Sequence, residues 1–374
     1  MSKTNLRFAG TEDVPAVKRL NNRLLAGGRP EQVTLRFSLP GEARFRPEGF
    51  PVYRRLLVAE DEGEIHAALL LYHNNVFIRG DKQDFCWLDM PVSEGIVNRK
   101  HSLEILKLMK KAINYQPFLM SLGIGSLDEE ASRLFIKLGW KHGVVPFLFY
   151  PLKLNRVLRG LHYLENRPML RFGARLAAYT GAGALAGAIM RLKLRTRLAL
   201  SGYEVTVEPR FGDWADDVFH DAMQDYAVAI RSDATSLNII YPPDDPQYVR
   251  LRVSKAATKK DAGWIVVRRS RMENNQYFGN LTIGTLVDGF GRVADVPLLL
   301  AAGLKYLTTT DVDLALGNFS HKAWVTAATK LGMFSGPSNF YVFVSPHGSP
   351  LLTKGSLDEI HLTRGQGGGM VHLR

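Results

Sequence analysis

Two stretches of this sequence place charged residues just ahead of a predicted helix, an arrangement that can attract an anion. Residues 288–292 are Asp-Gly-Phe-Gly-Arg, and residues 94–102 carry Arg99 and Lys100 ahead of Ser102. Backbone N–H groups at a helix start have no partner within the helix, and the helix dipole favours negative charge there. Glycine permits close approach to the backbone, and arginine pairs well with phosphate. Both stretches are therefore candidate phosphate sites, although an ordinary turn with solvated charges would look the same.

Other reactive residue types form no motif in the sequence. The ten histidines lack metal-ligand spacing, and the single cysteine, Cys86, excludes an internal disulfide and a cysteine-rich zinc site, so we expect no metal. One cysteine in 374 residues is typical of a reducing compartment. Residues 1–15 carry charges where a secretion signal would be apolar, so we expect a cytoplasmic protein. Residues 365–370 (GQGGGM) predict a flexible terminus.

The length and composition favour two folded domains. At 374 residues the chain is longer than a typical single domain. Apolar residues make up 46% and charged residues 22%, which excludes a disordered chain and a polytopic membrane protein.

The pattern of apolar residues predicts the same order of elements twice. Periodicity indicates strand, helix, three strands, helix, strand, helix, strand, with the last strand at 144–150 in one copy and 340–344 in the other. We therefore expect an α/β (α+β) protein with two domains, each a mixed, mostly antiparallel sheet flanked by helices. The predicted units are an N-terminal domain (1–153), a basic helical linker (154–202), a C-terminal domain (203–347) and a tail (348–374).

The ends of the two copies match each other and carry a family resemblance. Helices predicted at 128–138 and 322–331 each end at a Lys-Leu-Gly turn, whose glycine (Gly139, Gly332) suits a helix C-cap, and a large apolar or aromatic residue follows. Residues 131–140 and 323–334 carry this pattern. This pattern resembles the GNAT superfamily of N-acetyltransferases, and the tandem copies resemble two-lobed FemABX-type enzymes. The resemblance covers nearly the whole chain outside residues 155–200. It implies transfer of an acyl or aminoacyl group from acyl-CoA or acyl carrier protein to an amine or hydroxyl.

The resemblance also implies donor-binding roles for particular residues. GNAT enzymes hold the pyrophosphate of acyl-CoA at the helix start after the fourth strand, in an Arg-x-x-Gly-x-Gly/Ala loop that neither copy matches completely. Asn318, after the fifth strand, would contact the pantetheine arm or the acceptor, and it is explained equally well as a helix N-cap. The implied donor-binding positions are Arg99, Lys100 and Ser102 in the first copy and Gly289, Gly291, Arg292 and Asn318 in the second.

GNAT chemistry further implies a base and often a phenol. The candidate base is Asp288, ahead of Asp89 and Glu94, and each of the three could equally be a turn carboxylate. The family phenol lies four residues before the turn glycine, where this chain has Phe135 and Ala328. The acid that protonates the leaving thiolate is therefore missing from both copies.

The linker concentrates the positive charge. The chain carries a net charge of +12, and nine basic residues against one acid between 156 and 197 supply 9 − 1 = 8 of it. Residues 176–190 are an uncharged run of 15, shorter than the roughly 20 residues that span a bilayer. This pattern predicts either an interfacial helix on an anionic membrane surface or a helix packed between the two lobes. Few aromatic residues accompany the charge, which disfavours nucleic acid as the partner.

Two functional hypotheses follow. The first is an acyltransferase whose second copy holds the reacting centre and whose first copy is a degenerate lobe, acting on a cell-envelope, lipid-linked or polysaccharide precursor at the inner face of the membrane. The alternative is a non-catalytic binding protein on the same fold, for a nucleotide, an acyl carrier or an anionic lipid.

Overall fold

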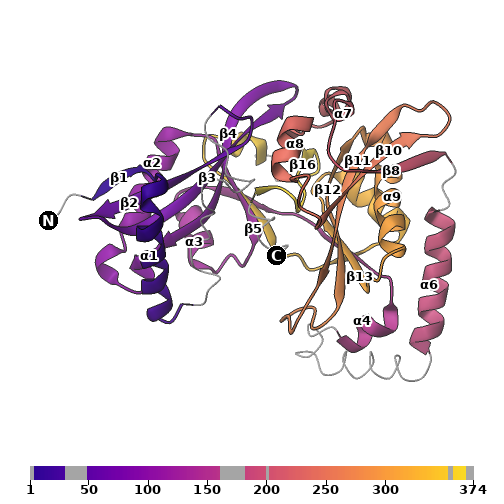
Figure 1. Cartoon of the computed structure of the whole chain (residues 1–374), viewed down its shortest axis with the longest axis horizontal. Helices are drawn as coiled ribbons and strands as arrows, with labels where there is room; N and C mark the ends of the chain where they lie inside the picture. Colours follow the sequence, from indigo (N-terminus) through magenta and orange to yellow (C-terminus); the bar gives the residue numbers. More distant parts are fainter. Residues whose placement is uncertain (1–3, 30–48, 161–181, 199–201, 353–356, 368–374) are drawn as a thin grey trace.

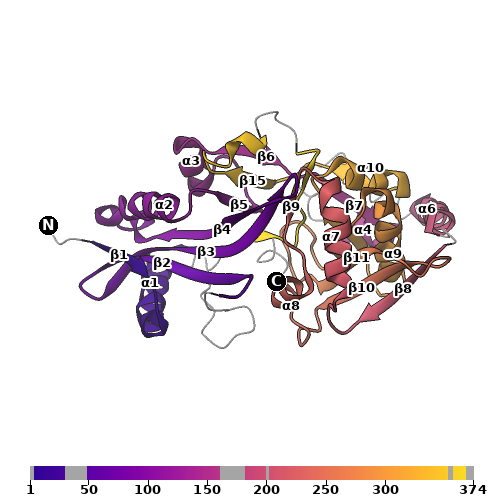
Figure 2. The ribbon, with the colours of Figure 1, turned by 90° about the horizontal axis from the view of Figure 1, so that it is seen from above.

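The chain folds into two mixed β-sheets with helices on their faces, which confirms the predicted α/β class (Figure 1). This computed structural model describes residues 4–29, 49–160, 182–198, 202–352 and 357–367. Seen from above, the N-terminal and C-terminal halves lie side by side along the long axis of the molecule (Figure 2).

The N-terminal sheet is built mainly from the first copy. Its strand order is β1-β2-β3-β4-β5-β15-β6, and β9 pairs with β3 while β16 pairs with β9. The β4–β5 and β9–β16 pairs are parallel, and the other pairs are antiparallel. The strands are β1 Asn5–Phe8, β2 Tyr53–Asp61, β3 Glu64–Ile78, β4 Asp81–Ser93, β5 Leu119–Ile124, β6 Lys141–Val144, β9 Val228–Ile230, β15 Phe340–Val344 and β16 Ile360–His361.

The C-terminal sheet repeats this plan. Its order is β14-β7-β13-β12-β11-β10-β8, and β12 and β13 form its parallel pair. Strand β10 was not predicted from the sequence. The strands are β7 Phe147–Pro151, β8 Tyr203–Glu208, β10 Tyr248–Lys255, β11 Asp261–Arg271, β12 Thr282–Gly291, β13 Leu314–Asn318 and β14 Phe334–Gly336.

Helices α1 and α2 each pack by one apolar stripe. In the first copy, Leu20 and Leu24 of α1 lie in the apolar cluster on one sheet face, and Leu108 and Met109 of α2 lie in the cluster on the other face. Gly332 ends α10 at φ +100°, which confirms its predicted role at the helix terminus. The helices are α1 Val14–Ala26, α2 Glu104–Tyr115, α3 Glu130–Lys137, α4 Leu154–Gly160, α6 Ala182–Leu198, α7 Trp214–Ala222, α8 Ala234–Ile240, α9 Val296–Thr308 and α10 Lys322–Leu331.

The two sheets exchange their last strands. β7 belongs to the first copy but pairs with β13 and β14 of the second, and β15 belongs to the second copy but pairs with β5 and β6 of the first. The single strand predicted at 144–150 is therefore wrong. It is two strands in different sheets, because the chain leaves the extended ladder at Val145 and Pro146, and proline has no N–H to continue it. The domain boundaries at 153 and 203 stay a proposal, since sheet membership crosses them.

The described part of the linker lies on the outside of the C-terminal half. Helix α6 occupies the far end of the molecule in both views (Figures 1 and 2). Its inner face joins the core of that half through Leu194 and Leu198, and the Tyr150 hydroxyl donates to the Met190 carbonyl at 2.7 Å. The alternative of a helix packed between the lobes is therefore wrong for α6. Among the described residues no helix is long and apolar enough to cross a membrane, and residues 161–181 of the linker lie outside them.

Candidate active site

In the parallel pairs β4–β5 and β12–β13, one in each sheet, pairing stops well before the strands end, and we call this stretch a fork. In the N-terminal fork, β4 and β5 share only the pairs Cys86–Leu119 and Trp87–Met120, although β4 continues to Ser93. In the C-terminal fork, β12 and β13 share four pairs and β12 continues to Gly291. A β-bulge interrupts the antiparallel ladder beside each fork, on β3–β4 and on β11–β12. Bulges are frequent next to active sites, where they redirect a side chain.

The C-terminal fork is filled by the end of the chain. The Gly365 N–H donates to the Val287 carbonyl at 2.8 Å, and Thr363 pairs with Phe319 as an isolated β-bridge. Residues 360–366 are all buried. The predicted flexible terminus at 365–370 is therefore wrong for Gly365 to Gly367, and residues 368–370 lie outside the described residues. Glycine is required at 365, because a Cβ there would lie 2.1 Å from the Tyr241 hydroxyl.

Asp288 is the group that holds this tail. Its Oδ1 accepts hydrogen bonds from the Thr363 hydroxyl at 2.7 Å and the Gly289 N–H at 2.8 Å, and its Oδ2 accepts one from the Tyr241 hydroxyl at 2.8 Å. The residue is only 3% exposed. Burial raises the pKa of Asp288 to about 6, although the hydrogen bonds from Thr363, Tyr241 and Gly289 favour the ionised form. Both oxygens are therefore hydrogen-bonded, and the buried Asp288 side chain holds the tail at Thr363 against β12.

The glycines predicted to bind the donor lie inside strand β12. A Cβ on Gly289 would approach the Trp324 ring to 2.8 Å, and one on Gly291 would approach the Ala262 carbonyl oxygen to 2.4 Å. Close packing therefore explains both glycines without a ligand. Asn318 is buried, and its amide accepts from Arg364 at 2.8 Å and donates to the Pro146 carbonyl at 3.1 Å.

The start of α9 already has carboxylates for partners. Asp225 accepts the Val293 N–H at 2.9 Å, and Asp295, buried beside it, pairs with Lys255 at 2.8 Å. Arg292 is exposed at the same place. Two acidic groups at a helix N-terminus stabilise it and repel a further anion. This helix start is therefore poorly suited to a pyrophosphate.

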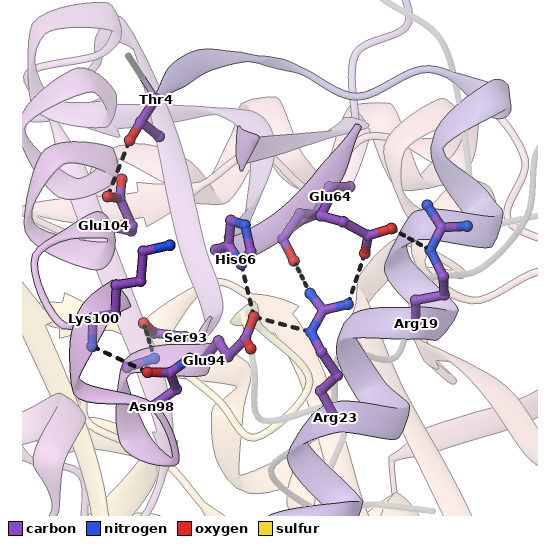
Figure 3. A network of polar contacts seen from close by, with 12 residues as sticks. Thr4, Arg19, Arg23, Glu64, His66, Ser93, Glu94, Asn98, Lys100 and Glu104 are labelled. Carbon is purple, nitrogen blue, oxygen red and sulfur yellow. Dashed lines mark hydrogen bonds and ion pairs between the residues drawn. The ribbon is translucent and has the colours of Figure 1, made fainter. Parts of the chain in front are cut away.

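The segment before α2 carries exposed cations, although α2 itself begins with the buried Glu104, whose Oε1 accepts from the Thr4 hydroxyl at 3.0 Å and from Lys107 at 2.9 Å. Arg99, Lys100 and Ser102 are exposed there, and the Ser102 hydroxyl donates to the Arg99 carbonyl at 2.7 Å. The Lys100 N–H is capped by the Asn98 side chain at 3.2 Å, so the backbone turns tightly before the helix (Figure 3). Arg99 and Lys100 can attract a phosphate group to this segment, whereas the buried Glu104, the first residue of α2, opposes it.

The other two candidate bases lie in the N-terminal half and differ from each other. Asp89 is partly buried and sits directly opposite Leu70, so it lies on the α1 face of the sheet beside the fork. Glu94 is buried and accepts hydrogen bonds from Arg23 at 3.0 Å and His66 at 2.8 Å, as Figure 3 shows. Burial alone would raise the pKa of Glu94, but His66 and Arg23 outweigh it and hold the pKa below its ordinary value. Glu94 is thus an ion-pair partner and a poor base.

One group of possible metal ligands escaped the sequence analysis because its members are far apart in the chain. Among the described residues, His66, Glu94 and His101 place their ligand atoms within 4.8 Å of one another. The two imidazole rings stack at 3.7 Å with an interplanar angle of 8°. A metal ion binds in the plane of an imidazole ring, so two stacked, parallel rings cannot both direct a nitrogen lone pair at one ion. The Glu94 carboxylate is also already hydrogen-bonded to Arg23. The arrangement fits an ion-pair cluster better than a metal centre.

A polar cleft of about 650 Å³ lies where the halves meet. His73 and Tyr115 line it from the N-terminal half, and Arg231 lines it from the C-terminal half. His73 stacks on Tyr53 at 4.1 Å, and burial, reinforced by Arg55, lowers the pKa of His73 to about 4. Its neighbour Cys86, 3.3 Å away, is buried, and burial raises the pKa of the thiol, so this pair is no nucleophilic dyad. No sequence motif indicated this cleft.

A second, smaller cavity of about 40 Å³ lies closer to the N-terminal fork. Trp87, Arg54 and Ile239 line it together with Gly365 to Gly367 of the tail. A Cβ on Gly367 would lie 3.0 Å from Trp87 and 3.1 Å from Leu122, so the tail reaches the fork there. The tail thus connects the two forks.

The phenol positions hold no acid. Phe135 is buried and stacks on Trp140 at 4.8 Å, and Ala328 is buried in α10. The nearby Tyr150 is committed to the Met190 carbonyl. A leaving thiolate would therefore take its proton from elsewhere.

This architecture is shared with solved acyltransferase structures. N-myristoyltransferase of Saccharomyces cerevisiae, solved with bound myristoyl-CoA and inhibitors, is 10% identical and aligns over 92% of this chain and 80% of its own, with a TM-score of 0.52. A protein of unknown function from Enterococcus faecalis V583, described as a "probable N-acyltransferase", is 8% identical over 91% of this chain and 72% of its own, also with a TM-score of 0.52.

The chain has a tandem GNAT-like fold. A tandem GNAT protein from the clavulanic acid biosynthesis pathway is also similar, at 12% identity over 91% of this chain and 98% of its own, with a TM-score of 0.46. No protein-family model and no curated protein matches the sequence. At these identities the likeness concerns the GNAT-like fold alone.

Proposed function

We propose that this protein is an acyltransferase that moves an acyl or aminoacyl group from acyl-CoA or acyl carrier protein to an amine or hydroxyl. The observation that carries the proposal is the N-terminal fork, where the β4–β5 pairing ends at Trp87 while β4 continues to Ser93. Beyond Trp87 the β4 backbone is not paired with β5, and we place the thioester there, next to Gly367 of the tail. The neighbour solved with myristoyl-CoA supports a thioester donor on this fold.

The proposed donor site is the start of α2. Arg99, Lys100 and Ser102 supply exposed charge and donors there, whereas the start of α9 carries Asp225 and Asp295. Both helix starts carry an acid, Glu104 in α2 and Asp295 before α9, so the two exposed cations Arg99 and Lys100 are the reason to prefer the first copy for the pyrophosphate. The sequence favoured the second copy, and the filled C-terminal fork is the physical reason to prefer the first.

Asp89 is the proposed base. It lies on β4 beside the fork, on the same face as Leu70, and it is only partly buried. Asp288, in contrast, is enclosed by Tyr241, Thr363 and the backbone of Gly289. A base must reach its acceptor directly or through one water, which supports Asp89 over Asp288.

The proposed step forms one bond and breaks one. The lone pair of the acceptor nitrogen or oxygen attacks the thioester carbonyl carbon, and the Asp89 carboxylate takes the acceptor proton. The carbon–sulfur bond then breaks and the thiolate leaves. Because Phe135 and Ala328 stand where the family phenol would be, the thiolate takes its proton from solvent.

The proposed acceptor is a cell-envelope, lipid-linked or polysaccharide precursor. Asp89 does not line the polar cleft between the halves, so we assign that cleft, whose lining includes Lys82, Asp84 and Arg231, to the sugar or charged headgroup of the precursor away from the reacting group. We also propose a peripheral position at the inner face of the membrane, for which α6 supplies the evidence.

Thermal unfolding with added donors tests the proposal. Acetyl-CoA, palmitoyl-CoA and an acyl carrier protein should be titrated separately, and a ligand at 100 times its Kd should stabilise the chain by about 2.7 kcal/mol. CoA release can then be followed with amine and hydroxyl acceptors. If none of the donors raises the Tm, the protein is not a thioester-dependent acyltransferase.

The filled C-terminal fork and the absent phenols favour a second candidate, a non-catalytic binding protein for a nucleotide, an acyl carrier or an anionic lipid. Its expected outcome is a Tm shift with one of these ligands and no CoA release with any acceptor. In that case Asp89→Asn would leave ligand binding unchanged.

A further inference from the structure

Helix α6 has two apolar faces, and only one of them packs against the protein. The inner face buries Leu194 and Leu198, which are 2% and 6% exposed. The outer face presents Leu185, Ile189 and Leu192, which are 66%, 47% and 65% exposed. These three follow the i, i+4, i+7 spacing of a single helical stripe. A surface helix of a water-soluble domain would usually carry polar residues on that stripe.

Cations border the exposed stripe on both sides. At 3.6 residues per turn, Lys193 and Arg195 lie about 80° to either side of Leu185 around the helix axis. Both are exposed, and α6 contains no acidic residue. The stripe is thus apolar in the centre and positively charged at its edges.

The helix is held with this stripe outward. Its inner face rests on α4, α9 and α10, and the Tyr150 hydroxyl donates to the Met190 carbonyl at 2.7 Å. In both views α6 forms the end of the molecule farthest from the N-terminal sheet (Figures 1 and 2). The surrounding protein therefore presents the stripe and its cations without obstruction by the N-terminal half.

We propose that the outer face of α6 is a membrane-binding surface that lies flat on an anionic leaflet. Leu185, Ile189 and Leu192 insert among the lipid headgroups, and Lys193 and Arg195 lie at the level of the lipid phosphates. A dimer through this face is disfavoured, because it would place the cations of one copy against those of the other. The apolar stripe decides against nucleic acid, because its side chains neither stack on bases nor pair with phosphates.

Vesicle co-sedimentation of the full-length protein tests this surface. The probes are vesicles of phosphatidylcholine alone and vesicles with phosphatidylcholine and phosphatidylglycerol in a three-to-one ratio. We expect binding to the anionic vesicles at low salt, weakening as salt rises, and little binding to phosphatidylcholine alone. Equal binding to both, or none to the anionic vesicles, overturns the proposal.

Matched variants locate the surface. Lys193→Gln with Arg195→Gln should weaken vesicle binding about 25-fold, since each cation contributes roughly five-fold. Leu185→Ser, Ile189→Ser and Leu192→Ser together should weaken it at least as much. The controls are Lys110→Gln with Lys111→Gln on α2, and Val205→Ser with Val207→Ser on the exposed face of β8. Controls that weaken binding as much as the α6 variants would assign the contact elsewhere and refute the proposal.

A labelled variant reports insertion directly. Cys86 is the only cysteine and is buried, so Leu192→Cys can be labelled selectively with an environment-sensitive fluorophore. We expect a blue shift on anionic vesicles and none at a Val207→Cys control. If the label is buried without lipid in dimers that form with rising concentration, or shifts similarly on duplex DNA, then a second copy or nucleic acid, and not a membrane, binds this surface. The inference is independent of the proposed acyl transfer, because the α6 variants should leave the donor-induced Tm shift unchanged.

Discussion

The forks beside β4 and β12 hold an acidic residue each, in contrasting surroundings. Asp288 lies within the C-terminal fork, encased by Tyr241, Thr363 and the tail, whereas Asp89 lies beside the N-terminal fork and keeps part of its surface exposed. The segments before the nearby helices also differ, since Asp225 and Asp295 flank the start of α9 whereas exposed cations precede α2, which itself begins with the buried Glu104. On the proposed assignment of Asp89 as the base, the two copies share a fold but use the carboxylates at their forks differently. Burial, more than residue type, would then separate the two roles.

The largest expected effect is on turnover in the N-terminal fork. Asp89→Asn should lower kcat about 10²- to 10⁴-fold, the contribution typical of a general base, while donor binding persists. CoA release measures the rate, and donor-induced Tm shifts measure binding. Asp288→Asn is the matched control and should change kcat only a few-fold in protein that remains folded. The reverse ranking of the two variants would place the reaction in the second copy.

The next effect is on stability in the C-terminal fork. Asp288→Ala leaves the buried Tyr241 and Thr363 hydroxyls without their acceptor and should lower the free energy of unfolding by about 3 kcal/mol, at 1–3 kcal/mol for each group. Asp89→Ala should cost about 1 kcal/mol or less, because its surface is partly exposed. Urea unfolding gives both values. Equal losses would mean that the two carboxylates have equivalent surroundings.

The pH dependence of folding stability, of similar or smaller size, reports on the burial of Asp288. The pKa of Asp288 is raised to about 6, so between pH 4 and 6 the folded state holds a proton that the unfolded state has released. Stability from this group is therefore greatest at low pH and falls as the pH rises, by about 2 to 3 kcal/mol in total.

The measurement is the difference in unfolding free energy between wild type and Asp288→Asn. Subtraction removes the opposing contribution of buried histidines such as His361, whose pKa burial lowers to about 3. From pH 4 to 6 the unfolding free energy of the wild type should decrease relative to that of the variant. If this difference in unfolding free energy does not change with pH, the pKa of Asp288 is not raised.

The smallest expected effect is on donor affinity at the helix starts. Arg99→Glu with Lys100→Glu should weaken acyl-CoA binding about tenfold, at roughly 0.3–1 kcal/mol for each charge near a helix start. Arg292→Glu, before α9, should leave the affinity unchanged. Calorimetric titration with acetyl-CoA compares the two variants. A stronger loss from Arg292→Glu would move the donor site to the second copy.

The sequence predicted the tandem α/β layout well, because apolar periodicity is a local property. Helix α10 and strand β15 occur with the predicted bounds, Lys322–Leu331 and Phe340–Val344. The partner of β15 could not be predicted, since a strand pattern does not reveal which sheet it joins. The segment around Pro146, predicted as one strand, is divided between two sheets for the same reason.

The position of the tail and the surroundings of the carboxylates could not be predicted from the sequence either. Glycines at 365 and 367 are typical of a flexible end, yet they lie there because only glycine fits beside Tyr241 and Trp87. The enclosure of Asp288 depends on Thr363, 75 residues away in the chain, so no local signal could reveal it. Contacts at that separation are set by the tertiary fold.

The exchange of β7 and β15 has a consequence for biosynthesis. Leu119 and Ser345, which hydrogen-bond beside β5, are 226 residues apart, so the N-terminal sheet is incomplete until the chain has left the ribosome as far as β15. During translation the edge of β5 has no neighbour, and unpaired strand edges promote association between nascent chains. Expression of either half alone should therefore give aggregated material, and chaperones that shield nascent strands should raise the yield of the intact protein.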